Sequence, residues 1–140
     1  MCALLCNGAS LKEGDGNWMV VGDPTEGALL VAGSKGGLRK EDVEPVHPFV
    51  EEIPFDSDRK MMTIVRRSDG QFVAYVKGAP DVLLSRCRDY VTIQGESQPL
   101  TDSIREAILA ANQQFARQAL RVVALAQRRM DQEPTIFQAE

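Results

Sequence analysis

An Asp-Gly pair at residues 69–70 lies between two runs rich in strand-forming residues, 59–65 and 72–76. Asp-Gly between two such runs is a strong short-range signal for a two-residue turn, because the central positions of that turn need a positive φ. The two runs are therefore predicted to form an antiparallel hairpin. This feature constrains the fold most, because the length of the turn fixes which residues of the two strands face each other.

A two-residue turn has a definite consequence for two lysines. It pairs Met62 with Lys77 and leaves Lys60 two residues along on the same face. A three-residue turn would shift the register by one residue and bring Met61 opposite Lys77 instead. We expect the first register, in which Lys60, Met62 and Lys77 share one surface.

The whole pattern predicts an α+β protein in a single domain, residues 1–140. Asp23, followed by proline at the first helical position, begins a helix that ends near Gly36. Thr101 begins the longest helix, whose recurring apolar residues are predicted to face the core: Ile104, Ile108, Ala111 and Phe115. Further expected segments are helices at 3–7 and 80–87, strands at 18–21, 90–93 and 122–126, a connector at 38–45 and an extended stretch at 46–55.

Composition argues against several partners. The formal net charge is −4, whereas nucleic acids and anionic membrane surfaces favour large basic patches. No apolar run approaches the roughly 20 residues that a transmembrane helix needs, and no secretory signal opens the chain. We therefore expect neither nucleic acid nor a membrane as a direct partner.

The cysteines and the single histidine carry little functional signal. Three cysteines are an odd number without a disulfide pattern, which fits a reducing compartment. Cys2 and Cys6 have the spacing of two ligands on one helix face, but two ligands without a second pair are too few for a metal site. His47 has no nearby nucleophile and is expected to be structural or exposed.

Phe55 and two lysines, Lys60 and Lys77, combine groups that suit one kind of ligand. A flat apolar ring stacks on a nucleobase, and fixed ammonium groups neutralise phosphates. This combination indicates a nucleotide site. A second interpretation stays open on these residues alone, in which the lysines lie solvated on a half-exposed sheet and Phe55 is a core aromatic.

Four strings of the sequence, in order, resemble the nucleotide-binding domain of cation-transporting P-type ATPases, and the calcium-pump-like branch most. They are GDPTEGALL at 22–30, PFDSDRKMM at 54–62, KGAPD at 77–81 and LRVVALA at 120–126. The resemblance runs over essentially the whole chain. It implies a twisted antiparallel β-sheet flanked by helices.

The resemblance also implies roles for individual residues. Phe55 would stack on adenine, and the Glu26 carboxylate would accept a hydrogen bond from the adenine amino group. Lys77 would lie at the floor of the pocket, and Arg121 would reach the phosphates. The other implied ATP-binding residues line the pocket or let the backbone come close: Lys60, Met62, Gly78 and Ala79. Calcium pumps often carry an arginine where this chain has Ser57, so one phosphate contact of the family is not carried over.

Glu26 has a second interpretation on spacing alone. It stands three residues after Asp23, the position of the glutamate in a capping box, and such a glutamate needs no ligand. The spacing favours the cap, whereas the resemblance favours contact with adenine.

No GxxxxGK[ST] loop occurs in the sequence, and neither does the DKTGT motif whose aspartate accepts phosphate in the family. The resemblance therefore implies a domain that holds ATP without hydrolysing it, with no catalytic residue and no metal site of its own. It would be a cytoplasmic domain excised from a membrane-embedded pump that uses Mg-ATP, and its partners would be the pump's phosphorylation and actuator domains.

Calcium is the transported ion that the resemblance favours. The alternative function is a stand-alone nucleotide-binding or sensing module. A protein-interaction domain with incidental lysines is a third possibility, which an ATP titration would separate from the other two.

Overall fold

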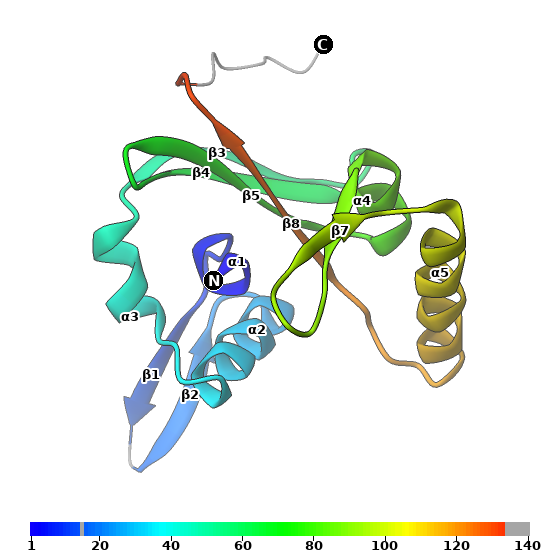
Figure 1. Ribbon diagram of the computed structural model, residues 1–140. Helices are drawn as coiled ribbons and strands as arrows, with labels where there is room; N and C mark the ends of the chain where they lie inside the picture. The colour runs from blue at the N-terminus through cyan, green and yellow to red at the C-terminus, as the bar shows by residue number, and fades with distance from the viewer. Residues whose placement is uncertain (15, 134–140) are drawn as a thin grey trace.

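A four-stranded antiparallel sheet is the central element of the structure, a computed structural model that describes residues 1–14 and 16–133. Its strands, in spatial order, are β3 (Phe49–Asp56), β4 (Met61–Ser68), β5 (Gln71–Gly78) and β8 (Ala124–Met130). Helices flank this sheet (Figure 1), so the protein is α+β as the sequence predicts.

The β4–β5 hairpin has the two-residue turn. Asp69 and Gly70 have φ angles of 52° and 78°, which a turn that follows the twist of the strands requires. Met62 consequently pairs with Lys77. The register that the Asp-Gly pair predicts is confirmed, and the alternative with Met61 opposite Lys77 is wrong.

The N-terminal elements lie on one side of the sheet (Figure 1). Helix α1 (Cys2–Leu5) packs against β5 and β8, and α2 (Pro24–Lys35) packs on α1. The hairpin of β1 (Ser10–Gly14) and β2 (Asn17–Val21) packs on α2 and extends away from the sheet. Gly33 lets α2 come close to α1, because a Cβ there would lie 2.5 Å from Leu4 Cδ2. The main core lies between α1, α2 and the sheet and contains Leu4, Leu5, Cys6, Ala9, Leu30, Val43, Met62, Ile64, Val73 and Tyr75.

The expected connector after α2 contains two short helices, α3 (Lys40–Val43) and the 3₁₀ helix η1 (Glu44–Val46). Pro45 lies in the first turn of η1, where its missing N–H costs no hydrogen bond, and Val43 is buried in the core. The extended segment therefore starts at Phe49, three residues later than expected. This difference matters for the site, because α3 carries Lys40.

The C-terminal half contains α4 (Pro80–Arg86), the small hairpin of β6 (Asp89–Val91) and β7 (Ser97–Pro99), and α5 (Asp102–Arg117). Thr101 caps α5 as predicted, since its hydroxyl accepts from Ile104 N at 3.4 Å. The predicted core-facing stripe of α5 is wrong: no residue of this helix is buried and Phe115 is 47% exposed. α5 lies at the side of the molecule away from α1 (Figure 1), so only α4 contacts it substantially.

None of the helices in the described ranges is long and apolar enough to cross a membrane.

Candidate nucleotide-binding site

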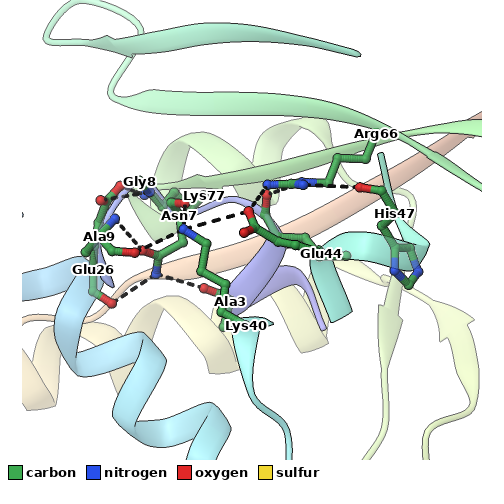
Figure 2. A network of polar contacts seen from close by, with 11 residues as sticks. Ala3, Asn7, Gly8, Ala9, Glu26, Lys40, Glu44, His47, Arg66 and Lys77 are labelled. Carbon is green, nitrogen blue, oxygen red and sulfur yellow. Dashed lines mark hydrogen bonds and ion pairs between the residues drawn. The ribbon is translucent and has the colours of Figure 1, made fainter. Parts of the chain in front are cut away.

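An ion pair between Glu26 and Lys77 joins two elements that lie 51 residues apart in the sequence. Glu26 belongs to the first turn of α2 and Lys77 to the end of β5. Their side chains are only 14% and 11% exposed. The second carboxylate oxygen, Glu26 Oε2, accepts a hydrogen bond from Gly8 N at 3.0 Å. Figure 2 shows both contacts converging on Glu26.

The start of α2 does not use Glu26 as a cap. Asp23 Oδ1 accepts from Thr25 N at 2.8 Å and from Glu26 N at 3.1 Å. The hydrogen bond from the Glu26 backbone N–H lowers the pKa of the Asp23 carboxyl. The Glu26 carboxylate points instead to Lys77 and Gly8, so the capping-box interpretation of this residue is wrong.

The floor beneath Lys77 is apolar. Met62, its partner across the hairpin, is 7% exposed and belongs to the core. Cys6 Sγ donates to Met62 O at 3.7 Å. Burial raises the pKa of the Cys6 thiol, although the nearby Lys77 ammonium acts in the opposite direction. The structure thus brings Lys77, Glu26 and Met62 together, and the Glu26–Lys77 ion pair lies beside a residue of the hydrophobic core.

Lys60 lies elsewhere than the sequence predicts. Asp56 Oδ1 accepts from the backbone N–H groups of Asp58 and Arg59, both at 2.9 Å, and this side-chain turn ends β3. Lys60 follows with a φ of 52°, before β4 begins, and it is exposed. The expectation that strand alternation places it on the face of Met62 and Lys77 is therefore wrong.

Gly78 and Ala79 contact Lys60 through the backbone. Ala79 N donates to Lys60 O at 3.0 Å. A Cβ on Gly78 would lie 2.6 Å from that same carbonyl oxygen and 2.7 Å from Met61 Cβ. Only glycine therefore fits at 78, and this close approach fixes the turn that carries Lys60 against the end of β5.

Phe55 is exposed on the edge strand β3, with 62% of its surface open to solvent. Ile53 pairs with Thr63 and Asp56 with Met61, so Pro54 and Phe55 together oppose the single residue Met62. Two residues opposite one make a β-bulge, which locally redirects the side chains of the strand. The interpretation of Phe55 as a core aromatic is wrong, and its ring is accessible to a ligand.

Arg121, just before β8, reaches the start of α2. Its Nη1 donates to Thr25 Oγ1 at 3.1 Å. Thr25 precedes Glu26 in the chain, so Arg121, Glu26 and Lys77 converge on one helix end. Sequence reasoning did not single out Thr25 as a site residue, although it lies in the Asp-Pro-Thr-Glu string that begins α2.

A polar network behind Glu26 was also not predicted (Figure 2). It runs through Asn7, Lys40, Glu44 and Arg66. Most of its hydrogen bonds end on backbone carbonyls, including Arg66 Nε to Leu5 O at 2.9 Å. His47, expected to be structural or exposed, has Nδ1 2.8 Å from Val43 O and its own carbonyl bound by Arg66.

Within residues 1–14 and 16–133, no group of three His, Cys, Asp or Glu side chains is arranged to hold a metal ion. Cys2 and Cys6 bond to backbone carbonyls instead, and burial raises the pKa of Cys2 to about 12.

Chemically, the site offers four groups to a ligand. They are the carboxylate of Glu26, the ammonium of Lys77, the guanidinium of Arg121 and the exposed ring of Phe55.

Comparison with known proteins identifies the family. Residues 1–140 match the family described as P-type ATPase, cytoplasmic domain N. A calcium-transporting ATPase of Bacillus subtilis is 42% identical over 139 residues, which cover 97% of this chain and 16% of that protein. Calcium-transporting ATPase 1 of Bacillus cereus is 43% identical over 123 residues, 88% of this chain and 13% of that protein.

The similarity extends to pumps named for other ions. A sodium/potassium exporting P-type ATPase of Schizosaccharomyces pombe is 39% identical over 132 residues, which cover 93% of this chain and 12% of that protein. The chain thus spans 16% or less of the length of these three relatives. With a match over its whole length, the chain belongs to the family of N domains of cation-transporting P-type ATPases.

Proposed function

We propose that this domain binds ATP and presents it to another domain of a cation pump. The observation that carries the proposal is the Glu26–Lys77 pair at the start of α2, together with an exposed aromatic, Phe55, on the edge strand β3 opposite Met62, the residue that pairs with Lys77. The carboxylate of Glu26 can accept a hydrogen bond from the adenine amino group, and the ring of Phe55 can stack on the purine.

The phosphates would extend towards the basic groups around this pair. Arg121 is exposed, and within the described residues its side chain donates only to the Thr25 hydroxyl, so it can turn to a phosphate at little cost. Lys60 is exposed in the turn after β3, and its lysine side chain is long enough to follow a flexible polyphosphate. Met62, Gly78 and Ala79 would shape the floor and wall of the pocket.

We further propose that the domain does not hydrolyse ATP alone. The sequence has no DKTGT motif, so the aspartate that would accept the phosphoryl group belongs to another domain of the parent pump. In that pump, Mg-ATP would be the substrate, and the phosphorylation and actuator domains would be the partners. The names of the bacterial relatives support calcium as the transported ion of the parent.

Calorimetric or NMR titration of the 140-residue chain with ATP tests the proposal. We expect saturable binding with a Kd of roughly 0.1 to several mM, because about 1–3 kcal/mol of stacking and a few solvent-exposed charge contacts must overcome the entropy of association. A phosphate-release assay on the same sample should stay at its blank value. Enzyme-dependent release, or no saturable binding in that range, would refute the proposal.

A further inference from the structure

Lys40 holds two backbone carbonyls behind the Glu26–Lys77 pair. Its Nζ donates to Asn7 O at 2.7 Å and to Ala9 O at 3.0 Å, and its side chain is 15% exposed (Figure 2). A lysine ammonium so largely removed from water needs such acceptors. Lys40 therefore fixes the backbone turn at residues 7–9.

Glu44 is only a secondary partner of Lys40. Its Oε1 lies 3.8 Å from Lys40 Nζ but 2.6 Å from Arg66 Nη2. The guanidinium thus has the closer contact with this carboxylate. The two short hydrogen bonds of Lys40 go to the turn, and the ammonium acts mainly on the backbone there.

One peptide group connects Lys40 to Glu26. The Asn7 carbonyl accepts from Lys40, and the Gly8 N–H of the same peptide donates to Glu26 Oε2 at 3.0 Å. A planar trans peptide points its C=O and N–H in opposite directions, so a cation at one end and a carboxylate at the other align with its dipole. Hydrogen bonds arranged in such a chain strengthen one another.

Asn7 locks the orientation of this peptide. It is 2% exposed, its Oδ1 accepts from Ala9 N at 2.9 Å, and its Nδ2 donates to Ala3 O at 3.0 Å and to Glu26 O at 2.9 Å. A Cβ at Gly8 would lie 3.4 Å from Glu26 Oε2. The turn therefore contacts both the backbone and the carboxylate of Glu26.

We propose that Lys40 is a positioning residue for base recognition, acting on Glu26 through the peptide that joins Asn7 to Gly8. Lys77 holds one carboxylate oxygen and the Gly8 N–H holds the other, so the carboxylate has one orientation. Its remaining lone pairs are then aimed at the adenine amino group. This inference rests on the proposed ATP-binding function and adds to it a specificity determinant that does not touch the nucleotide.

The first test compares ATP and GTP binding in Lys40→Met, with Lys12→Met as the matched control. Lys12 is exposed on β1 and donates none of these hydrogen bonds. We expect Lys40→Met to weaken ATP binding about fivefold and GTP binding much less. A fivefold loss is the size expected when the charge-assisted hydrogen bonds that orient the acceptor carboxylate are removed. Lys12→Met should leave both affinities and their ratio unchanged. A general loss of stability would lower the folded fraction equally for both nucleotides and leave the ratio intact.

The second test needs no nucleotide. The Gly8 amide proton, bound to a carboxylate and polarised by Lys40, should resonate downfield in the NMR spectrum. In Lys40→Met it should move upfield and exchange faster with solvent, whereas Lys12→Met should not move it. If the wild-type chain binds no ATP but the Gly8 signal responds in this way, the connection stands and the proposed function fails.

An unmoved Gly8 signal together with an unchanged ATP-to-GTP ratio in Lys40→Met would overturn the inference. If Lys40→Met does not fold, Lys40→Gln carries both tests, because it keeps a donor without the charge and should give a smaller change in the same direction. In a Glu26→Gln background, Lys40→Met should not change the ratio further, because its effect passes through that carboxylate. If Lys40→Met reduced the ATP-to-GTP ratio in the Glu26→Gln background as much as it does in wild type, the inference would also be overturned.

Discussion

The two sides of the candidate site are built differently. On one side, Glu26 and Lys77 have side chains that are 14% and 11% exposed, and a network of hydrogen bonds holds them from behind. On the other side, Phe55 is 62% exposed on an edge strand, and Lys60 lies in a turn. The side chains of the first side are fixed before a ligand arrives, whereas the side chains of the second side are exposed to solvent.

This difference separates the chemical tasks of the two sides. A hydrogen bond to a base discriminates only when its acceptor cannot turn away, so a preorganised carboxylate favours selectivity. Stacking and phosphate contacts tolerate small displacements, so an exposed ring and an exposed lysine supply affinity without selectivity. We therefore expect changes on the fixed side to affect stability or selectivity, and changes on the exposed side to affect affinity alone.

The largest expected effect is on the fixed side. Arg66 is 5% exposed and donates to Leu5 O, His47 O and Glu44, so Arg66→Met leaves these acceptors without their donor. We expect it to lower the free energy of unfolding by about 3 kcal/mol, measured by urea denaturation.

Arg67→Met is the matched control, because Arg67 is exposed and lies over the Phe72 ring, 5.0 Å from its centroid. It should cost under about 1 kcal/mol. Equal costs for the two variants would show that the network does not stabilise the domain.

Phe55→Ala should have the next largest effect, and only on binding. Losing the stacking contact should weaken ATP by about 2 kcal/mol, roughly thirtyfold, and GTP by the same factor. The free energy of unfolding should stay within about 0.5 kcal/mol of wild type, because an exposed ring is lost. Phe49→Ala serves as control, since Phe49 lies on the same strand and is 57% exposed. Similar losses of ATP affinity in both variants would remove Phe55 from the site.

Asp23→Ala should have a smaller effect, on the end of α2. Losing its two hydrogen bonds to Thr25 N and Glu26 N should lower Tm by about 3 °C at pH 7. The folded-state pKa of Asp23 lies below its ordinary value of 3.8, so its contribution is complete above that value and is lost as pH falls through the lower folded pKa. The Tm difference from wild type should therefore shrink below about pH 4. A difference that is constant down to pH 2 would contradict the cap.

Local signals predicted the fixed side in part. The Asp-Gly turn predicted the pairing of Met62 with Lys77, and the Asp-Pro pair predicted the start of α2, because both depend on neighbouring residues. The contacts of Lys40 and Arg66 could not be predicted in this way. Most of them end on backbone carbonyls that are 19 to 61 residues distant, which carry no side-chain signature in the sequence.

The wrong predictions have physical causes as well. Strand alternation was extended from Met62 back to Lys60, but Lys60 still belongs to the turn that follows Asp56, and β4 begins only at Met61. The apolar stripe of α5 was assigned to the core from its periodicity, yet periodicity states which residues share a face and not what covers that face. The location of Phe55 at a bulge depends on the register between β3 and β4, which no local pattern fixes.

Titration of wild type, Glu26→Gln and Phe55→Ala with ATP and with GTP tests the division of tasks most directly. Thermal unfolding should first confirm that each variant is folded. A fixed carboxylate accepts a hydrogen bond from the amino group of adenine, whereas guanine presents a carbonyl oxygen that it repels. We therefore expect wild type to prefer ATP by roughly 1–3 kcal/mol. Glu26→Gln should reduce this preference about fivefold to tenfold, while Phe55→Ala should weaken both nucleotides equally and keep it. An unchanged ATP-to-GTP ratio in Glu26→Gln would show that this carboxylate does not recognise the base.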